Sequence, residues 1–258
     1  MPELLKTILL GIIQGLTEFL PVSSSGHLVL FHDLFDFHDN SLLLDVFLHV
    51  GTLVPVLIVF RNDIASLLTT RRRWLPLLAA GTVPVVLAGV LLYERLEASA
   101  ITSGWVGLLL LINGAMLVAG SRLEARRAAR SPGWLHAAAV GVAQAVAILP
   151  GISRSGSTIS TGLATGLERE DAARFSFLLA IPAIVLALAF KLWKVFNGAE
   201  PVAAGTWGSV AVGTVVAMLV GYGALRALLV VVRRHKLAYF GLYCLVLGAA
   251  VLVYALVH

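Results

Sequence analysis

One stretch, Gly141 to Thr158, constrains the fold more than any other part of the chain. It lies within a long apolar sequence, yet it carries an arginine, several hydroxyls and the dipeptide Pro150-Gly151. A helix cannot continue through this dipeptide without losing a backbone hydrogen bond and a steric fit. In lipid, backbone groups freed in this way must be satisfied by protein or by a water-filled cavity. We therefore expect irregular backbone over 153–158, lining a cavity.

Arg154 is the candidate binding residue of this stretch. Its guanidinium keeps its charge and offers a planar fork of donors that suits phosphate. A helix that begins near Ser157 would also direct its positive end at the cavity. The hydroxyls that add donors belong to Ser153, Ser155, Ser157 and Thr158. Together these groups predict an anion site, with phosphate as the favoured anion. The alternative is a buried structural salt bridge, for example to Glu18, which would still place Arg154 in the cavity.

A second broken stretch, Gly11 to His27, is similar to the first at a shift of 130 positions. Each stretch has a proline just before its hydroxyl cluster, at Pro21 and Pro150. The matched pairs are Gly11 and Gly141, Gln14 and Gln144, Ser23 and Ser153, Ser25 and Ser155, and Gly26 and Gly156. Two interrupted hydrophobic segments in corresponding halves are typical of inverted-repeat membrane proteins, whose site lies where the repeats meet.

The composition is that of a membrane protein. The chain is 59% hydrophobic and 13% charged, with a mean hydropathy of +0.94, whereas a soluble domain is about half apolar and a quarter charged. The net charge of +5 is spread over short loops, so we interpret it as a topology signal and expect no nucleic-acid partner. The single cysteine, Cys244, excludes an internal disulfide and a cysteine metal site.

The apolar runs predict an all-α polytopic membrane protein with six transmembrane helices and two re-entrant helix hairpins. A bilayer crossing needs about 20 apolar residues, so the broken segments 4–36 and 135–167 are expected to enter and leave on one side. The expected spans lie near 42–60, 75–94, 104–121, 172–193, 206–231 and 236–257. We interpret residues 1–258 as a single integral membrane domain with inverted-topology repeats, repeat one over about 1–121 and repeat two over about 135–257.

The positions of Lys and Arg predict the orientation. One side of the predicted helices carries Arg61, Arg71, Arg72, Arg73, Arg122, Arg126, Arg127, Arg130, Arg169, Arg174, Arg233, Arg234 and Lys236. The other side carries only Lys6, Arg95, Lys191 and Lys194. We expect the basic side to face the cytoplasm and both termini to lie outside. The first hairpin would then enter from outside and the second from inside.

The first broken stretch carries candidate catalytic groups. Gln14 and Glu18 share one helix face. Because a carboxylate inside a membrane segment is costly and normally faces a polar interior, we interpret Glu18 as a metal ligand or proton-transfer group. The alternative is hydrogen bonding to a neighbouring helix. Ser24 lies near His27, and a hydroxyl with a base in reach can be a nucleophile. The alternatives are that His27 is structural and that the serines cap a helix beginning near Gly26, in which case Ser25 could cap while Ser24 reacts.

Two other polar groups are expected to have ordinary roles. His49 follows Asp45 by four residues, which could support a metal ligand, but a hydrogen bond along the helix surface is the favoured interpretation. A cluster of acidic residues and histidines follows the first broken stretch, and we expect it to be a solvated loop. Its members are His32, Asp33, Asp36, His38 and Asp39.

At these residues the chain resembles a known family. The stretches GIIQGLTEFLPVSSSGH and LPGISRSGST are similar to the two signature stretches of the undecaprenyl-diphosphate phosphatase family of the bacitracin-resistance type. The segment DVFLHVGTLVPVLIVFRND at 45–63 is similar as well. The family pattern opens with Glu or Gln, three residues and then Glu, and this chain has the Gln form. The serine and histidine of the first motif fall on Ser24 and His27, and the arginine of the second falls on Arg154.

The resemblance implies an integral enzyme of the bacterial plasma (inner) membrane, with its active site opening to the periplasm. Such an enzyme hydrolyses undecaprenyl diphosphate to undecaprenyl phosphate and inorganic phosphate. It recycles the lipid carrier for peptidoglycan synthesis, and with it cell-wall biogenesis and cell shape, and it confers antibiotic resistance, to bacitracin, when abundant. It uses a divalent cation, with Mg²⁺ and Ca²⁺ as candidates. The expected partners are the prenyl diphosphate lipid and the bilayer, and a homodimer is left open.

We assign expected roles on this basis. Arg154 would hold the substrate phosphates together with Ser23, Ser25, Ser153, Ser155, Ser157 and Thr158. Ser24 would attack with His27 as general base and acid, although His27 itself could be the phosphoryl acceptor. Glu18 would hold the metal, with Gln14 beside it, or position a water. The alternative function is an anion or lipid-phosphate transporter or flippase, because inverted repeats with broken helices are also transporter architecture.

Overall fold

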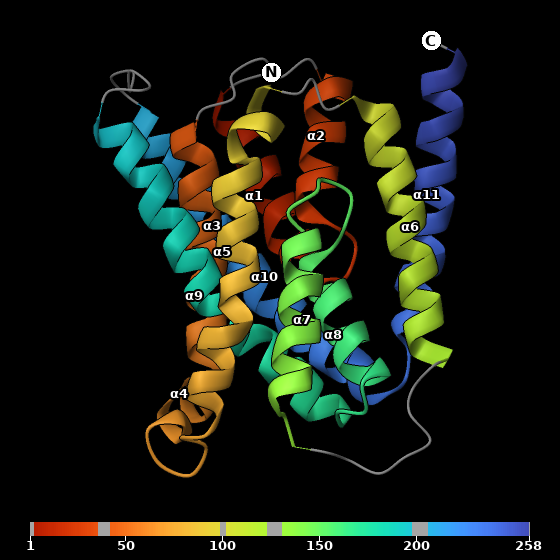
Figure 1. Cartoon of the computed structure of the whole chain (residues 1–258). Helices are drawn as coiled ribbons and strands as arrows, with labels where there is room; N and C mark the ends of the chain where they lie inside the picture. The colour runs from red at the N-terminus through yellow and green to blue at the C-terminus, as the bar shows by residue number, and fades with distance from the viewer. Residues whose placement is uncertain (1–2, 36–41, 99–101, 123–130, 198–205, 258) are drawn as a thin grey trace.

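The computed structural model describes residues 3–35, 42–98, 102–122, 131–197 and 206–257. Over these ranges the chain is built from helices, so the predicted all-α class is confirmed (Figure 1). The helices are α1 (Glu3–Phe19), α2 (Ser24–Phe35), α3 (Leu42–Val59), α4 (Arg61–Leu67), α5 (Trp74–Ala98), α6 (Ser103–Arg122), α7 (Trp134–Val146), α8 (Arg154–Ala164), α9 (Arg169–Phe196), α10 (Thr206–Arg233) and α11 (Leu237–Val257).

The protein is a multi-pass membrane protein. Among the described residues, α5, α6, α9, α10 and α11 each contain a segment long and apolar enough to cross a bilayer. The helices α3 and α4 supply a sixth span if they count as one, although they bend by 72° after Val59. The predicted six crossings agree with this larger count. The short helix α4 was not predicted, and it begins with the polar run Arg61-Asn62-Asp63, which an apolar pattern does not detect.

The two broken segments approach each other from opposite ends of the molecule. Figure 1 shows α1 and α2 in the half that contains both termini, and α7 and α8 in the other half. Their breaks meet where the backbone N–H of Gly151 donates to Ser23 Oγ at 3.0 Å. Both residues have left-handed backbone, with φ of 71° at Ser23 and 112° at Gly151. The re-entrant character of these segments and the exact repeat boundaries stay predictions.

The structure corrects the start of both inner helices. Helix α8 begins at Arg154 and not near Ser157, and α2 begins at Ser24 and not near Gly26. The expectation of irregular backbone over 153–158 is therefore wrong, since the break ends at Ser153. The physical reason is that a serine side chain caps each helix earlier than predicted, which satisfies free N–H groups of the first turn.

Matched glycines let each broken segment pack closely on a span from the other half. A Cβ on Gly141 of α7 would lie 2.4 Å from the carbonyl oxygen of Gly81 on α5. A Cβ on Gly11 of α1 would lie 2.7 Å from the carbonyl oxygen of Gly213 on α10. Small residues at such contacts allow the backbones to approach, as is typical of membrane helix pairs. The glycine match in the sequence is thus a match in packing, which agrees with an internal repeat.

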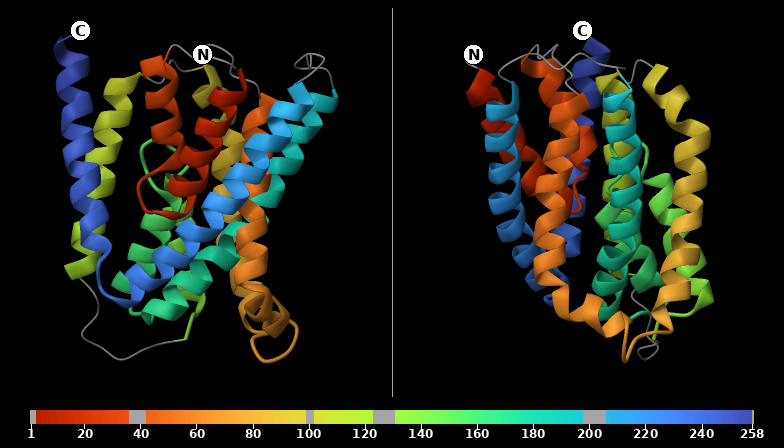
Figure 2. Two further views of the ribbon diagram at one scale, coloured as in Figure 1. Left: turned by 180° about the vertical axis from the view of Figure 1, so that it is seen from behind. Right: turned by 90° about the vertical axis from the view of Figure 1, so that its left-hand side faces the viewer.

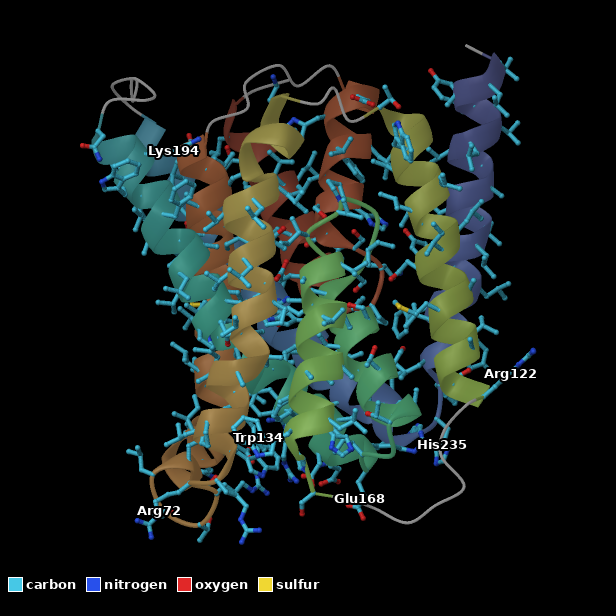
Figure 3. All side chains as sticks on the ribbon, in the orientation of Figure 1. Arg72, Arg122, Trp134, Glu168, Lys194 and His235 are labelled. Carbon is cyan, nitrogen blue, oxygen red and sulfur yellow. The ribbon has the colours of Figure 1, made fainter. Side chains whose placement is uncertain are left out.

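The two ends of the molecule differ in charge. Both termini lie at one end in every view (Figure 2), and Arg72, Arg122 and His235 lie at the opposite end, away from Lys194 (Figure 3). At the basic end, Arg174 contacts Asp63 at 3.3 Å and Glu170 at 3.1 Å, which joins α9 to α4. Arg126, Arg127 and Arg130, which were part of the predicted basic side, lie outside the described residues.

The asymmetry of charge predicts that the basic end is cytoplasmic. In a Cys244→Ala background, we expect a membrane-impermeant thiol reagent added from outside to label Asn197→Cys and to spare Arg72→Cys. Both positions are exposed, so each should be labelled once the membrane is permeabilised. Labelling of Arg72→Cys in intact cells, with Asn197→Cys protected, would reverse the orientation.

Candidate functional site

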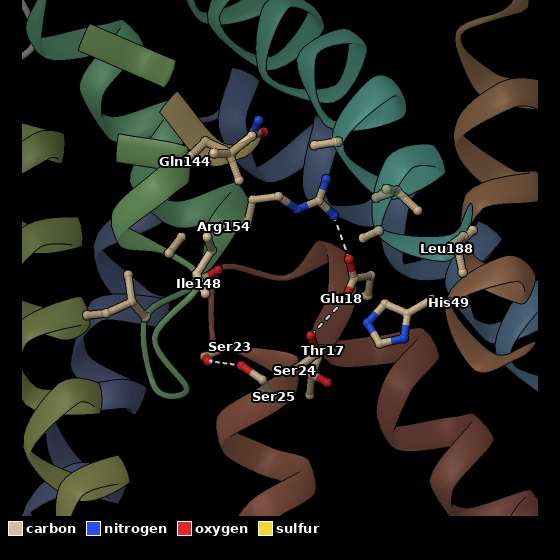
Figure 4. Close-up of a pocket in the computed structure, with 17 residues that line it drawn as sticks. Thr17, Glu18, Ser23, Ser24, Ser25, His49, Gln144, Ile148, Arg154 and Leu188 are labelled. Carbon is tan, nitrogen blue, oxygen red and sulfur yellow. Dashed lines mark hydrogen bonds and ion pairs between the residues drawn. The ribbon is translucent and has the colours of Figure 1, made fainter. Parts of the chain in front are cut away.

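The breaks lie beside a cavity of about 320 Å³ (Figure 4). One part of its lining is polar and comes from α1, α2, α3, α7 and α8, and another is aliphatic and comes mainly from α5 and α9. The polar residues are Thr17, Glu18, Ser23, Ser24, Ser25, His49, Gln144, Ser153 and Arg154. The aliphatic wall includes Val85, Ala183, Ile184, Ala187 and Leu188. The cavity therefore has a polar, charged side and an aliphatic wall that suits a hydrocarbon chain.

A buried ion pair joins the two halves within this cavity. The guanidinium of Arg154 on α8 donates to Glu18 Oε1 on α1 at 2.5 Å, and the side chains are 17% and 8% exposed. The salt bridge considered as an alternative for Arg154 is thus present, and both partners line the cavity. Burying two charges is costly unless further hydrogen bonds satisfy them. Glu18 Oε2 accepts two, from Ser24 Oγ at 2.7 Å and from Gln14 Nε2 at 3.1 Å.

The helix starts at the cavity are built alike. Ser153 Oγ accepts from the backbone N–H of Gly156 at 3.1 Å, and Ser23 Oγ accepts from that of Gly26 at 3.3 Å. Each serine therefore caps the helix that follows it, so the positive ends of α8 and α2 both face the cavity. Helix N-termini favour anions, so the prediction of an anion site agrees with this geometry.

The hydroxyls predicted to bind phosphate separate into two groups. Ser23, Ser25 and Ser153 line the cavity, whereas Ser155, Ser157 and Thr158 are buried away from its lining. Because α8 begins at Arg154, Ser157 and Thr158 donate to the Arg154 carbonyl at 3.1 and 2.7 Å, and Ser155 pairs with Ser153 at 3.2 Å. Their contact with phosphate stays a prediction that this placement does not favour.

His27 does not line the cavity. Its Nδ1 lies 2.8 Å from the carbonyl oxygen of Ser23, which can only accept, so Nδ1 carries a proton. Its Nε2 lies 2.8 Å from the hydroxyl of Tyr243 on α11. The ring thus supports the left-handed backbone at Ser23, and both of its nitrogens are engaged. The sequence placed His27 beside Ser24 along the chain, but the two side chains leave α2 in different directions.

His49 is the imidazole that lines the cavity. Its Nδ1 donates to the Asp45 carbonyl at 2.8 Å, as the helix-surface interpretation expected. Figure 4 shows the ring beside Glu18. The signal that could have found it is a histidine within an otherwise apolar span, because ionisable groups there normally face a polar interior. Of the other predicted cluster, His32 and Asp33 lie in α2, so the expectation of a loop is wrong for these two, and Asp36, His38 and Asp39 lie outside the described residues.

Asn113 was missed by sequence reasoning, and it joins the two breaks. This fully buried side chain on α6 donates to the Pro21 carbonyl at 3.1 Å and accepts from the Ser153 N–H at 2.9 Å. One amide therefore satisfies a free carbonyl of one break and a free N–H of the other. The signal was again a lone polar residue in an apolar run, LLLLINGAML.

The oxygen atoms at Glu18 are of the type that binds a hard divalent cation, but they are too few to complete its coordination. Among the described residues, no group of three or more His, Cys, Asp or Glu side chains is placed to hold a metal. Glu18 offers a carboxylate, and the buried Oε1 of Gln14 beside it has no hydrogen-bond partner in the part of the chain that the structure describes. Mg²⁺ is commonly held by one or two carboxylates together with substrate phosphates. The site thus fits a cation whose remaining ligands come from substrate and water.

Comparison with known proteins identifies the family. The model of the family described as bacitracin resistance protein BacA matches residues 7–250. The chain belongs to this family.

Relatives that are similar over nearly their full length carry the name undecaprenyl-diphosphatase. The protein of Halothermothrix orenii is 43% identical over an alignment of 259 residues, gaps included, that covers 98% of each chain. That of Carboxydothermus hydrogenoformans is 43% identical over 250 residues, which cover 96% of each chain. That of Treponema denticola is 38% identical over an alignment of 268 residues, gaps included, that covers 98% of this chain and 97% of the relative.

In this BacA-family protein, Asn113 should be a main stabiliser of the site. Asn113→Leu leaves the buried N–H of Ser153 without a partner and the Pro21 carbonyl with only the weak thiol donor of Cys244 at 3.8 Å, and an unsatisfied buried group costs about 1–3 kcal/mol. We expect a clear fall in the thermal unfolding temperature in detergent. Ser121→Ala on the same helix is the control, because within the described ranges its hydroxyl bonds only to the Val118 carbonyl of its own helix. Equal stability of the two variants would contradict the bridging role.

Proposed function

We propose that this protein removes the terminal phosphate of undecaprenyl diphosphate, releasing inorganic phosphate and undecaprenyl phosphate. The observation that carries the proposal is the meeting of Arg154, Glu18 and Ser24 at two helix N-termini within a multi-pass membrane protein. The names of the full-length relatives support the same reaction. A transporter or flippase is not favoured, because it would not require a hydroxyl bonded to a carboxylate beside the anion site.

The cavity suggests how such a substrate binds. Arg154 and the positive ends of α2 and α8 would hold the diphosphate, with Ser23, Ser25 and Ser153 as neighbouring donors. The aliphatic wall from α5 and α9 would contact the first part of the prenyl chain, while the rest stays in the bilayer. We therefore place the phosphates against the polar side of the cavity and the start of the prenyl chain against its aliphatic wall.

The hydrogen bond from Ser24 to Glu18 suggests the chemical step. Ser24 Oγ attacks the terminal phosphorus, its proton passes to the Glu18 carboxylate, and the bond to the bridging oxygen breaks. Undecaprenyl phosphate leaves, and water then hydrolyses the phosphoserine. Arg154 stabilises the charge on the transferring phosphoryl group. We assign the proton-accepting role to Glu18 and a positioning role to His27, because Ser24 donates to Glu18 and both ring nitrogens of His27 are engaged elsewhere.

A divalent cation, Mg²⁺ or Ca²⁺, is part of the proposal. Glu18 would hold it, with Gln14 Oε1 as a further oxygen donor, and it would neutralise charge on the phosphates. We also propose a bacterial inner-membrane location, with the cavity open to the periplasm. This agrees with the predicted orientation and would let the enzyme recycle the lipid carrier for the cell wall. A homodimer stays a prediction.

The first test is phosphate release from undecaprenyl diphosphate by detergent-solubilised protein, where no gradient exists. We expect release that a chelator abolishes and that added Mg²⁺ or Ca²⁺ restores. Arg154→Lys keeps the charge but loses the planar fork, so we expect kcat/KM to fall by roughly 100-fold or more, as on removing a donor to transition-state charge. Absence of release by the purified wild-type protein would refute the proposed activity.

The second test concerns the nucleophile. Reaction with substrate labelled in the terminal phosphate, followed by a rapid quench, should trap acid-stable phosphate on Ser24. Ser24→Ala should remove this label and leave only the turnover that binding and electrostatics support. Acid-labile phosphate on His27 or His49 would overturn the assignment of Ser24. Direct attack by water, seen as inversion at phosphorus without any labelled enzyme, would overturn it too.

A further inference from the structure

Gln144 is a buried amide at the cavity for which the steps above have no use. It lies on α7, it is 2% exposed, and it lines the cavity together with Arg154. Among the described residues, neither its Oε1 nor its Nε2 has a hydrogen-bond partner. Figure 4 shows its amide next to the Arg154 side chain. Buried side-chain amides are nearly always hydrogen-bonded, because an unmade bond costs the full desolvation penalty.

The matched residue of the other half shows what this amide lacks. Gln14 donates to Glu18, which lies one helical turn further along α1. One turn after Gln144, the corresponding residue is Ile148, which also lines the cavity. An aliphatic side chain cannot accept a hydrogen bond. The amide of Gln144 is thus left without the carboxylate that its counterpart has, and the cavity adjoins it.

We propose that Gln144 is a substrate-binding residue whose amide N–H donates to a phosphate oxygen of the bound diphosphate. This inference rests on the proposed function and adds a residue to it. The ligand oxygen would take the role toward Gln144 that the Glu18 carboxylate has toward Gln14. Arg154 supplies charge on the same side of the cavity, so the oxygen would be held by one charged and one neutral donor.

The same placement separates a binding role from a structural one. A glutamine retained for packing alone would be replaced by methionine with little effect on binding. Methionine has a similar length and no amide, so it also removes the unsatisfied polar atoms. A residue that binds substrate should therefore lose affinity in Gln144→Met while the free protein keeps or gains thermal stability.

The experiment measures phosphate release from undecaprenyl diphosphate by the detergent-purified full chain. A hydrogen bond to a charged group supports about a 10- to 100-fold change in affinity. We expect KM to rise by that factor in Gln144→Met with kcat within about threefold, as for loss of uniform binding. Gln144→Glu adds a negative charge beside the phosphates, so its KM should rise further.

A matched control is Ser160→Ala on α8. Ser160 is also buried, and its hydroxyl has no hydrogen-bond partner among the residues that the structure describes, but it does not line the cavity. Its KM should stay at the wild-type value. A KM for Gln144→Met that equals that of Ser160→Ala would overturn the inference.

A second readout does not depend on turnover. A non-hydrolysable methylene-bridged farnesyl bisphosphonate should raise the unfolding temperature of the wild-type protein and of Ser160→Ala, and raise that of Gln144→Met much less. Equal shifts in all three, or no shift in the wild type, would overturn the role of Gln144. Wild-type protein that binds the analogue but releases no phosphate would refute the proposed activity and leave the Gln144 result to be judged by the shifts.

Discussion

The ion pair between Glu18 and Arg154 is the constraint on which the rest of the structure depends. It joins the two broken segments inside an apolar protein, and either charge alone would be strongly destabilising there. Asn113 and the capping serines satisfy the backbone around it, and paired glycines let the helices approach closely enough to bring the breaks together. The polar groups thus form one connected network, and the cavity exists because that network needs irregular backbone.

The two halves share a framework and differ in the groups they present. Each break ends at a serine that caps the next helix, with a second serine two residues later. Beyond this framework, the first half contributes the carboxylate and the hydroxyl bonded to it, and the second contributes the guanidinium and an unpaired amide. We interpret this as a difference in role: the first half supplies the hydroxyl and the carboxylate for the chemical step, and the second adds a charged and a neutral donor to the phosphate-binding groups that both halves contribute.

Much of the fold could be predicted from the sequence, because prolines and apolar runs determine local structure. The breaks at Pro21 and Pro150 and the spans followed from helix geometry, whereas the contact of Arg154 with Glu18 was only the alternative to a phosphate-binding role. The direction in which each side chain points could not be predicted in this way. His27 turns toward Tyr243, whereas His49 reaches the cavity from another helix. Rotation of a helix about its axis is set by packing with distant segments, which a motif does not contain. The direction of the hydroxyls of α8 likewise depends on where that helix begins. The cap formed by Ser153 moves this start to Arg154.

A structure of the protein with a methylene-bridged undecaprenyl bisphosphonate and a divalent cation would test the proposed substrate site most directly. We expect the terminal phosphonate between the N-termini of α2 and α8, with Arg154 donating to it, Ser24 Oγ facing its phosphorus, and the Gln144 amide donating to an oxygen of the bisphosphonate. The chain of the analogue should lie against the wall from α5 and α9. A bisphosphonate bound elsewhere, for example at the arginines of the basic end, with the Glu18–Arg154 pair undisturbed, would contradict the proposed site.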